Sequence, residues 1–491
     1  MKSSSGISVL IIVILFLSYG CQPVKNSTDS IPPALLEDAY AQYKAPEIDN
    51  RRFGYDVIAP LIARRKAMFE TTELGKSVEG RPINALTYGE GTRKVLLWSQ
   101  MHGNESTATM ALFDLFNFLE GSADDGFEGI RSALRENLLL RFIPMLNPDG
   151  AEKFARRNAQ QIDLNRDAVR QSTPEGIVLK AARDDFEPEF GFNLHDQNRY
   201  YNVDGTALPA TISFLAPAYN EAREVNEVRS KAMKVIVGMN HLLQQVIPGQ
   251  VGKYDDSFEP RAFGDNIQKW GTSTILIESG AYFGDREKQY IRQLNFMIVL
   301  NALYEIATER YTQYTEEAYQ AIPENDSKLM DLLINNVETA DGDNKYRTDI
   351  GIKSSEQYLD SLILMKGSIA DWGDLSVYYG HEEIDAEGMS LEKGEIWPEV
   401  IPLEQLDSAK VLQMLKEGYL AVATDKHHQG KVHQLPILVY TEGNTPDLNP
   451  TLEQRPFFYL TANGKRLMAV INGNVIRMDG HKNESFWQLI E

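Results

Sequence analysis

A regular alternation of short apolar runs and longer amphipathic stretches between Leu35 and Arg310 most constrains how this chain can fold. Short apolar runs are typical of buried strands, and longer stretches with apolar residues at helical spacing are typical of helices. The expected strands are 94–99, 138–145, 212–216 and 274–278, and the expected helices are 107–120, 221–246 and 286–310. This order predicts an α/β domain in which helices flank a mostly parallel mixed sheet.

The character of the chain changes after Arg310. The stretch 311–328 is rich in Glu and Tyr and contains the turn-forming run Pro323 to Asp326, so we interpret it as a linker. Beyond it, β-like runs at 437–441, 457–461 and 467–476 are punctuated by Asn-Gly and Gly-Asn. We therefore predict a catalytic domain over 35–310 and a smaller β-rich accessory domain over 329–491. With 43% hydrophobic residues, the chain has enough apolar mass for both cores.

The first residues resemble an export signal. Lys2 is followed by serines, then by an apolar core from Ile7 to Leu17, which is too short to cross a bilayer comfortably. Cys21 is the only cysteine and stands where a bacterial lipoprotein signal places its acylated residue, although Leu17 lies one position too early for that motif. We predict a signal peptide over 1–20, a tether over 21–34, and an exported protein anchored by lipid at Cys21 on the periplasmic or outer side of a membrane. An ordinary signal peptide with an incidental cysteine is the alternative.

The overall charge excludes one class of partner. The formal net charge is -21 at pH 7, and no local basic patch offsets it. Nucleic acids and anionic lipid headgroups are therefore repelled, and nucleic-acid binding is not expected.

The candidate chemistry begins directly after the first expected strand. His102 and Glu105 stand three apart at its carboxyl end, and a histidine and a carboxylate so placed can hold one zinc ion. A His-x-x-Glu pair alone is weak evidence. A third ligand is expected at the end of another strand, and His195 is the candidate. His241 lies in a helical pattern. The remaining histidines fall in the tail, where a surface position is the simpler interpretation: His381, His427, His428, His433 and His481.

Further motifs follow in a recognisable order: Glu79-Gly-Arg-Pro82, His102-Gly-Asn-Glu105, Asn147-Pro-Asp-Gly150, Arg156-Arg-Asn158, Asp163-Leu-Asn-Arg166 and Ile277-Glu-Ser279. In order and approximate spacing they resemble the motifs of the zinc metallocarboxypeptidases typified by the pancreatic enzymes. The resemblance covers Thr71 to Arg310, about half of the chain. It implies a zinc-carboxypeptidase-like fold and one Zn²⁺ per chain.

The resemblance also implies roles for residues. His102, Glu105 and His195 match the zinc ligands, and Glu278 matches the general base that takes a proton from the zinc-activated water. Arg156 matches the cation that stabilises the oxyanion, and we prefer it to its neighbour Arg157.

Other matches concern the substrate. Asn165 and Arg166 match the pair that grips a C-terminal carboxylate, the feature that indicates an exopeptidase. Asp163 matches a carboxylate that orients His102. Arg81 corresponds to an arginine farther along the groove, and Tyr254 is the nearest candidate for the tyrosine that covers the substrate, although its spacing does not align cleanly.

The chain departs from the family pattern after Arg166. The family continues with Asn and an aromatic residue, whereas this chain has Asp167 and Ala168, so the packing behind the carboxylate clamp is expected to differ. The residue that sets the preferred terminal side chain lies in 263–271, where Asp265, Asn266 and Gln268 are candidates.

The predicted function is thus a zinc-dependent carboxypeptidase that acts on peptides. Two hydrolase alternatives stay open: an amidase or carboxypeptidase that cuts cell-wall stem peptides (a muropeptide substrate), and an acyl-amino-acid deacylase. A non-catalytic binding lipoprotein, with the tail as its working part, is a third. Trp372, Tyr378 and Tyr379 could form a binding patch of that tail, although core positions are the simpler interpretation.

Overall fold

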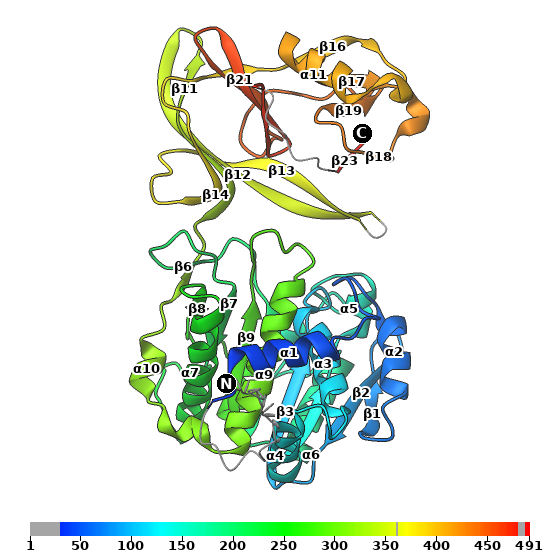
Figure 1. The fold of residues 1–491 in the computed structure, drawn as a ribbon, viewed down its shortest axis with the longest axis vertical. Coiled ribbons are helices and arrows are strands. Elements are labelled where there is room, and N and C mark those ends of the chain that lie inside the picture. Colours follow the sequence, from blue (N-terminus) through cyan, green and yellow to red (C-terminus); the bar gives the residue numbers. More distant parts are fainter. Residues whose placement is uncertain (1–29, 360–361, 480–486) are drawn as a thin grey trace, which may run out of the picture.

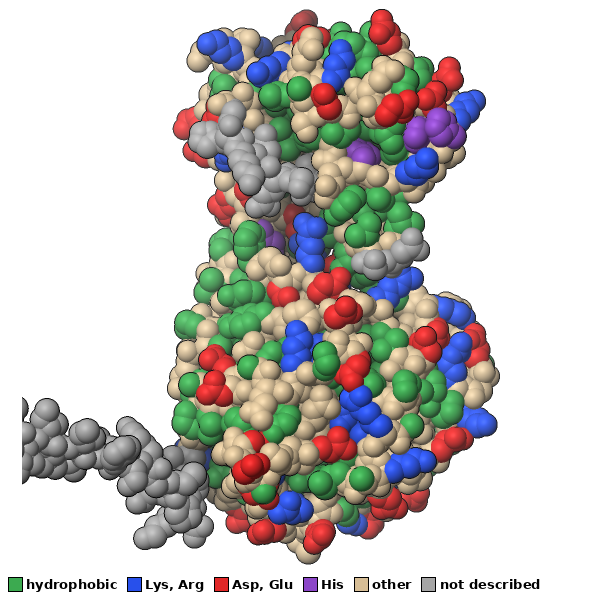
Figure 2. All heavy atoms as spheres, turned by 45° about the vertical axis from the view of Figure 1, so that its right-hand side comes forward, with side chains coloured by type: hydrophobic (Ala, Val, Ile, Leu, Met, Phe, Trp, Pro, Cys, Tyr) green, Lys and Arg blue, Asp and Glu red, His purple; other side chains and the backbone are tan. Residues whose placement is uncertain are grey.

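The computed structural model describes residues 30–359, 362–479 and 487–491. The predicted signal peptide and Cys21 lie outside these residues. Two lobes stand one above the other in Figure 1, with a narrowing between them that is also visible in Figure 2. None of the helices in the described part of the chain has the length and apolar character needed to cross a membrane.

An eight-stranded mixed sheet forms the centre of the N-terminal domain, in the order β1-β2-β4-β3-β5-β9-β7-β8. Its strands are β1 Glu70–Lys76, β2 Pro82–Tyr88, β3 Arg93–Ser99, β4 Leu138–Ile143, β5 Phe190–Asp196, β7 Ile212–Leu215, β8 Val251–Lys253 and β9 Ser273–Ser279. The central strands β4, β3, β5 and β9 are parallel to one another. The predicted α/β fold class is therefore confirmed, as are the four strands and three helices expected from the sequence, within a few residues at their ends.

Helices cover both faces of this sheet. One face packs against α1 Pro33–Tyr43, α3 Thr107–Leu119, α7 Glu227–Val246 and α9 Gln289–Ala307, and the other against α6 Pro174–Phe186 and α8 Phe263–Lys269. Alternation along β3 explains the two cores. Val95 and Leu97 belong to the first, whereas Leu96 and Trp98 belong to the second. A strand buried on both faces must be apolar throughout, which is why the sequence shows continuous runs.

The segment expected to be a linker packs largely on the N-terminal domain. It forms α10 Glu316–Gln320, and Tyr311, Tyr319 and Ile322 are buried in the first core. Next, β10 Asn325–Asp326 pairs with β6 Asn202–Val203 of that domain. The polar composition misled the prediction because glutamates separate these apolar side chains. The start of the domain is also slightly earlier than predicted, since Ile31 is buried in the same core.

The C-terminal domain is β-rich, as predicted. Its main sheet has the path β13-β12-β11-β15-β20-β21-β22, and β14 pairs with β11. Its strands are β11 Leu329–Asp341, β12 Asn344–Leu359, β13 Leu362–Gly373, β14 Tyr379–Asp385, β15 Ser390–Lys393, β20 Phe457–Ala462, β21 Lys465–Ile471 and β22 Asn474–Arg477. The run predicted over 467–476 is in fact the hairpin of β21 and β22. Trp372 packs against the core of this sheet, in agreement with the simpler interpretation.

A small α/β unit within this domain escaped the sequence analysis. Strands β16 Glu395–Val400, β17 Tyr419–Thr424 and β19 Leu438–Thr441 form a parallel sheet, and α11 Ser408–Glu417 lies between the first two in sequence. Its core around Leu415 and Val422 is shared with the main sheet, since Phe457 and Tyr459 of β20 belong to the same cluster. The amphipathic sequence of α11 carries the signal that could have revealed it.

Candidate active site

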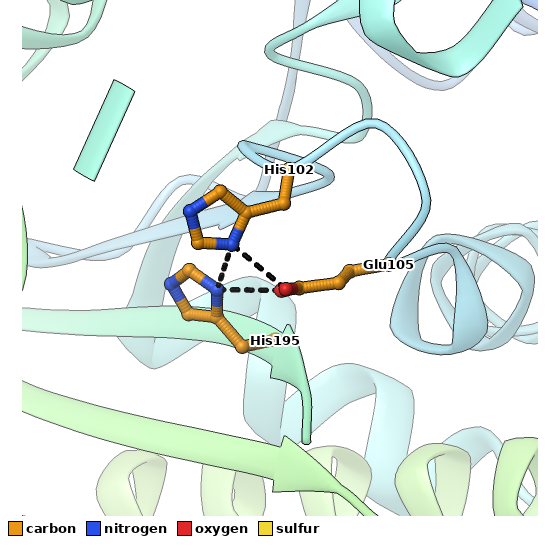
Figure 3. Close-up of side chains that lie close together, drawn as sticks. All are labelled: His102, Glu105 and His195. Carbon is orange, nitrogen blue, oxygen red and sulfur yellow. Dashed lines mark hydrogen bonds and ion pairs between the residues drawn. The ribbon is translucent and has the colours of Figure 1, made fainter. Parts of the chain in front are cut away.

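Three side chains meet at the carboxyl edge of the parallel strands. His102 and Glu105 follow β3, and His195 is the penultimate residue of β5. The Nδ1 atoms of the two histidines are 3.2 Å apart, and each lies 2.8 Å from an oxygen of Glu105. Figure 3 shows the three groups turned toward one another. All three are buried, with at most 7% of each residue exposed.

A tight turn after β3 places the first two residues. Gln100 has a positive φ of 53°, which is uncommon for a residue with a side chain, and its amide Nε2 donates to the carbonyl of Gly103. Gly103 lies against the backbone of the Asn147-Pro-Asp-Gly150 turn, where a Cβ would come within 2.0 Å of the Gly150 carbonyl carbon. Asn147 also donates from Nδ2 to the carbonyl of Met101. The Asn147–Gly150 turn therefore supports the loop that carries His102 and Glu105. Only glycine at position 103 permits this close approach of the two backbones.

Asp163 and Arg156 fix the orientation of His102. The Nε2 atom of His102 lies 3.0 Å from Asp163 Oδ1, which leaves Nδ1 to face Glu105 and His195. Arg156 Nη1 lies 3.1 Å from both His102 Nδ1 and Glu105 Oε1, and its Nε donates to Asp163. Arg157 donates instead to the carbonyl of Gln161. Of the two adjacent arginines, only Arg156 is thus brought to the site among the described contacts.

Electrostatics reflect this concentration of charge. Burial would raise the pKa of Glu105, but His102 and His195 hold that pKa far below its usual range. Burial opposes a charge on His102, yet Glu105 and Asp163 together raise its pKa. Burial lowers the pKa of His195 and is opposed only in part by Glu105. The Glu105 carboxylate beside two imidazole nitrogens provides the types of donor that a cation such as zinc binds.

Glu278 stands on the next strand, at the register position of His195. Burial, followed by repulsion from Glu105 and Asp196, raises the pKa of Glu278 well above its ordinary value. Tyr254 follows β8, and burial together with the negative charges of Glu278 and Glu105 raises its pKa. Its ring also contacts that of Tyr201, with centroids 5.5 Å apart. Both residues predicted from the second half of the domain therefore lie within electrostatic reach of the triad.

Asn165 and Arg166 lie on a short 3-10 turn that Asp163 begins, since the Asp163 carboxylate accepts from the Asn165 N–H. Asn165 Oδ1 accepts from the backbone N–H of Phe263 at the start of α8, so its NH₂ group is the donor that a ligand could use. Arg166 is exposed and pairs with Glu259, with 3.3 Å between Nε and Oε2. Asp167, a departure from the family pattern, is buried and accepts from Thr173, so it anchors the start of α6.

Arg81 lies among carboxylates rather than beside the triad. Its Nη1 is 2.6 Å from both Glu79 and the buried Asp149 of the Asn-Pro-Asp-Gly turn. The substrate contact predicted for Arg81 stays a prediction. Of the candidates for the terminal side-chain pocket, Asp265 is buried in α8, and burial raises its pKa to about 6.

The sequence analysis missed a supporting group behind the triad. The backbone N–H of Asp196 donates to Glu105 Oε2, and its carboxylate accepts from Thr107 and lies 3.1 Å from Lys288 Nζ. Asp196 could have been noticed, because it directly follows His195 at a strand end. Nothing in the sequence around Lys288 indicates its contact.

A comparison with known proteins bears on these residues. Residues 55–199 match the family model "Zinc carboxypeptidase". This segment resembles the zinc carboxypeptidase family. It contains the three triad residues together with Arg156, Asp163, Asn165 and Arg166, whereas Tyr254 and Glu278 lie beyond it.

Two curated relatives match parts of the chain. An uncharacterised protein of Zymomonas mobilis is 30% identical over 161 residues, which is 32% of this chain and 40% of that protein. A "Probable carboxypeptidase 2" of Trichophyton verrucosum is 26% identical over 131 residues, which is 25% of this chain and 24% of the relative. The chain thus spans less than half the length of either relative.

Two carboxypeptidases serve as examples of solved structures that are similar to this chain. A metallo-carboxypeptidase from Burkholderia cenocepacia aligns with 18% identity and a TM-score of 0.42, over 52% of this chain and 70% of that one. Carboxypeptidase A from Helicoverpa armigera aligns with 15% identity and a TM-score of 0.42, over 59% of this chain and 80% of that one.

Proposed function

We propose that this protein is a zinc-dependent carboxypeptidase that removes residues from the C-terminus of peptides. The observation that carries the proposal is the convergence of His102, Glu105 and His195 at donor separations of 2.8 to 3.2 Å. Tetrahedral zinc with ligands at about 2.0–2.1 Å requires donor atoms about 3.3 Å apart, so small adjustments of these side chains suffice. Two imidazoles and one carboxylate are also the donor set of known catalytic zinc sites.

When bound, zinc would supply a Lewis acid that polarises the scissile carbonyl and lowers the pKa of water. In the proposal, Glu278 takes the proton of the attacking water and delivers it to the leaving amine. Burial and neighbouring carboxylates raise its pKa, which strengthens it as a base, while a bound dication would keep it ionised near neutral pH.

Arg156 is proposed to stabilise the negative charge that develops on the carbonyl oxygen. Its side chain is 44% exposed and touches both His102 and Glu105, so it faces the open side of the triad. Asp163 holds Arg156 and the His102 ring in place.

Asn165 and Arg166 are proposed to bind the terminal carboxylate of the substrate. Arg166 is paired with Glu259 at 3.3 Å, and a bidentate carboxylate would replace that exposed pair. Tyr254 is proposed to approach the same substrate from β8.

The exopeptidase claim can be tested with matched peptides. Zinc-loaded protein is incubated with peptides that end in a free carboxylate and with the same peptides ending in an amide. Release of single residues from the free acids alone is expected. Equal cleavage of both, or internal cleavage, would contradict the proposed clamp. Release from cell-wall stem peptides alone would favour the muropeptide alternative.

We also propose export and lipid attachment at Cys21, on the basis of the N-terminal sequence alone. Metabolic labelling with a palmitate analogue tests this. Label is expected on the full-length chain and not on a Cys21→Ser variant, and equal labelling of the two would overturn it.

A further inference from the structure

A cavity of about 780 Å³ lies between the two domains, and both domains line it. Its wall on the N-terminal domain includes Gln197, Gly280 and Lys288. Gln197 is two residues beyond His195, and Gly280 is two residues beyond Glu278. Lys288 is bound to Asp196, whose backbone holds Glu105. The cavity therefore lies at the same strand ends as the triad, although His102, Glu105 and His195 do not themselves line it.

The opposite wall belongs to the C-terminal domain. Ser354 and Glu356 of β12, Met365 of β13, His381 of β14 and Val475 of β22 all line the cavity. In Figure 1 the β12–β13 hairpin runs across the top of the N-terminal domain. This is the edge at which β3, β5 and β9 end, and therefore the edge that carries the triad.

Specific contacts hold this hairpin in place. Glu356 forms an ion pair with Arg51, whose backbone carbonyl accepts from Ser106, the residue after Glu105. The Tyr358 ring lies against Phe154, with centroids 4.9 Å apart. At the other end, Asp331 of β11 binds Arg199 and accepts from Tyr200 at 2.6 Å. Contacts at both ends of the cavity therefore join this wall to the N-terminal domain.

The proposed carboxylate clamp lies outside the cavity. None of Arg156, Asn165 and Arg166 lines the cavity. A peptide held at its carboxylate by Asn165 and Arg166, with its scissile bond at the triad, can extend its preceding residues toward the interdomain cavity. The volume lies in the range of pockets for drug-sized ligands, which suits a segment of about three residues.

Apolar side chains stand on both walls of the cavity, among lining residues that include charged groups such as Arg51, Asp331 and Glu356. Phe283 is 77% exposed, and its ring centroid is 6.4 Å from that of His381 across the interdomain gap. Met365 and Val475 are partly exposed on the facing wall. These groups offer an apolar side chain of the substrate a place to lose contact with water.

We propose that the C-terminal domain forms the outer wall of the substrate site and binds the residues that precede the scissile bond, with a preference for apolar side chains there. The inference rests on the proposed carboxypeptidase function. It assigns the accessory domain to substrate recognition and predicts that extended C-terminal tails of at least four residues are the preferred substrates.

The test compares a blocked dipeptide with a pentapeptide that has the same C-terminal residue and apolar residues before it. In the wild type, kcat/KM for the pentapeptide is expected to exceed that for the dipeptide on the order of 10-fold. Met365→Glu should bring this ratio close to one, because it places a charge beside the apolar side chains that would contact the substrate. Tyr346→Glu, on β12 but outside the cavity and paired with β11, should leave the ratio unchanged. Val475→Glu provides a second variant in case Met365→Glu fails to fold.

Binding provides a readout that does not need turnover. The affinity of a fluorescent pentapeptide for Glu278→Gln protein is expected to fall about 10-fold when Met365→Glu is added, by the same reasoning. A ratio and an affinity that both stay unchanged would overturn the inference. If the wild type releases no residue from any peptide but the affinity loss is observed, the proposed function fails while the binding wall stands.

Discussion

The two domains bring metal-ligand side chains together in different surroundings. In the N-terminal domain, His102, Glu105 and His195 converge on one point. In the C-terminal domain, Asp425, His427 and His428 also come within metal-binding distance of one another, but on a surface turn where His427 is exposed and Lys431 lies 3.2 Å from His428. The difference teaches that proximity of ligand types is not enough. A buried site with supporting hydrogen bonds orients its ligands, and a surface cluster does not.

Substitution of the proposed general base should have the largest effect. Glu278→Gln keeps the size of the side chain but cannot accept the proton, so kcat for release of the C-terminal residue should fall about 1,000-fold. Zinc content should stay the same, because Glu278 is not a proposed ligand. Near-normal turnover in this variant would show that another group is the base.

The adjacent arginines provide a matched pair. Arg156→Ala should lower kcat about 100-fold, because it removes the cation beside the triad. Arg157→Ala should have little effect, because Arg157 contacts the carbonyl of Gln161 instead. Steady-state kinetics on one peptide separates the two. Equal losses would mean that the variants act through the folding of their shared loop.

Stability should respond to pH in opposite directions in the two domains. Burial raises the pKa of Glu305 in α9 from 4.5 to about 7, so the folded state binds this proton more tightly than the unfolded state. The contribution of Glu305 to the free energy of unfolding is fully present below pH 4.5 and is lost as the pH rises through 7. Burial lowers the pKa of His433 in the C-terminal domain from 6.5 to about 4. The contribution of His433 to the free energy of unfolding is fully present above pH 6.5 and is lost as the pH falls through 4.

Each of these effects should amount to roughly 3 kcal/mol. Hydrogen exchange read by mass spectrometry reports each domain separately, and Glu305→Gln and His433→Gln should each flatten the pH dependence of their own domain only. A variant that leaves its domain's pH dependence as it was would contradict the assignment of that group.

The smallest effect concerns the turn that positions the triad. Gly103→Ala should cost about 1–3 kcal/mol of stability, because its Cβ would meet the backbone of Gly150. Gly129→Ala in α4 Glu128–Asn137 meets open space and should stabilise by up to about 1 kcal/mol. Thermal unfolding of both variants checks the contrast. A Gly103→Ala protein as stable as the wild type would show that the loop of His102 and Glu105 does not need close contact with the Asn147–Gly150 turn.

Much of the N-terminal domain could be predicted because its strands are buried on both faces and its motifs lie at strand ends. His102, Glu105 and His195 could be proposed as partners from that placement alone. The contact of Lys288 with Asp196 could not, because it depends on how the loop after β9 folds back on the sheet. The same holds for Tyr311 and Tyr319, whose burial depends on packing partners far along the chain.

The C-terminal domain was less predictable for a physical reason. Its strands are partly exposed, so their side chains alternate and give weak apolar runs, as in β12. The contact of Glu356 with Arg51 joins residues from different domains, and no local pattern encodes it. The part proposed for the C-terminal domain in substrate recognition could therefore be inferred only from the three-dimensional structure.

The most direct test of the central claim is the metal content of three purified proteins after dialysis against limiting zinc. Wild type and His427→Ala should each retain one zinc per chain, and His195→Ala should retain none while keeping the wild-type hydrogen-exchange pattern away from β5. Zinc that persists in His195→Ala, or disappears in His427→Ala, would contradict the assignment of the metal to His102, Glu105 and His195.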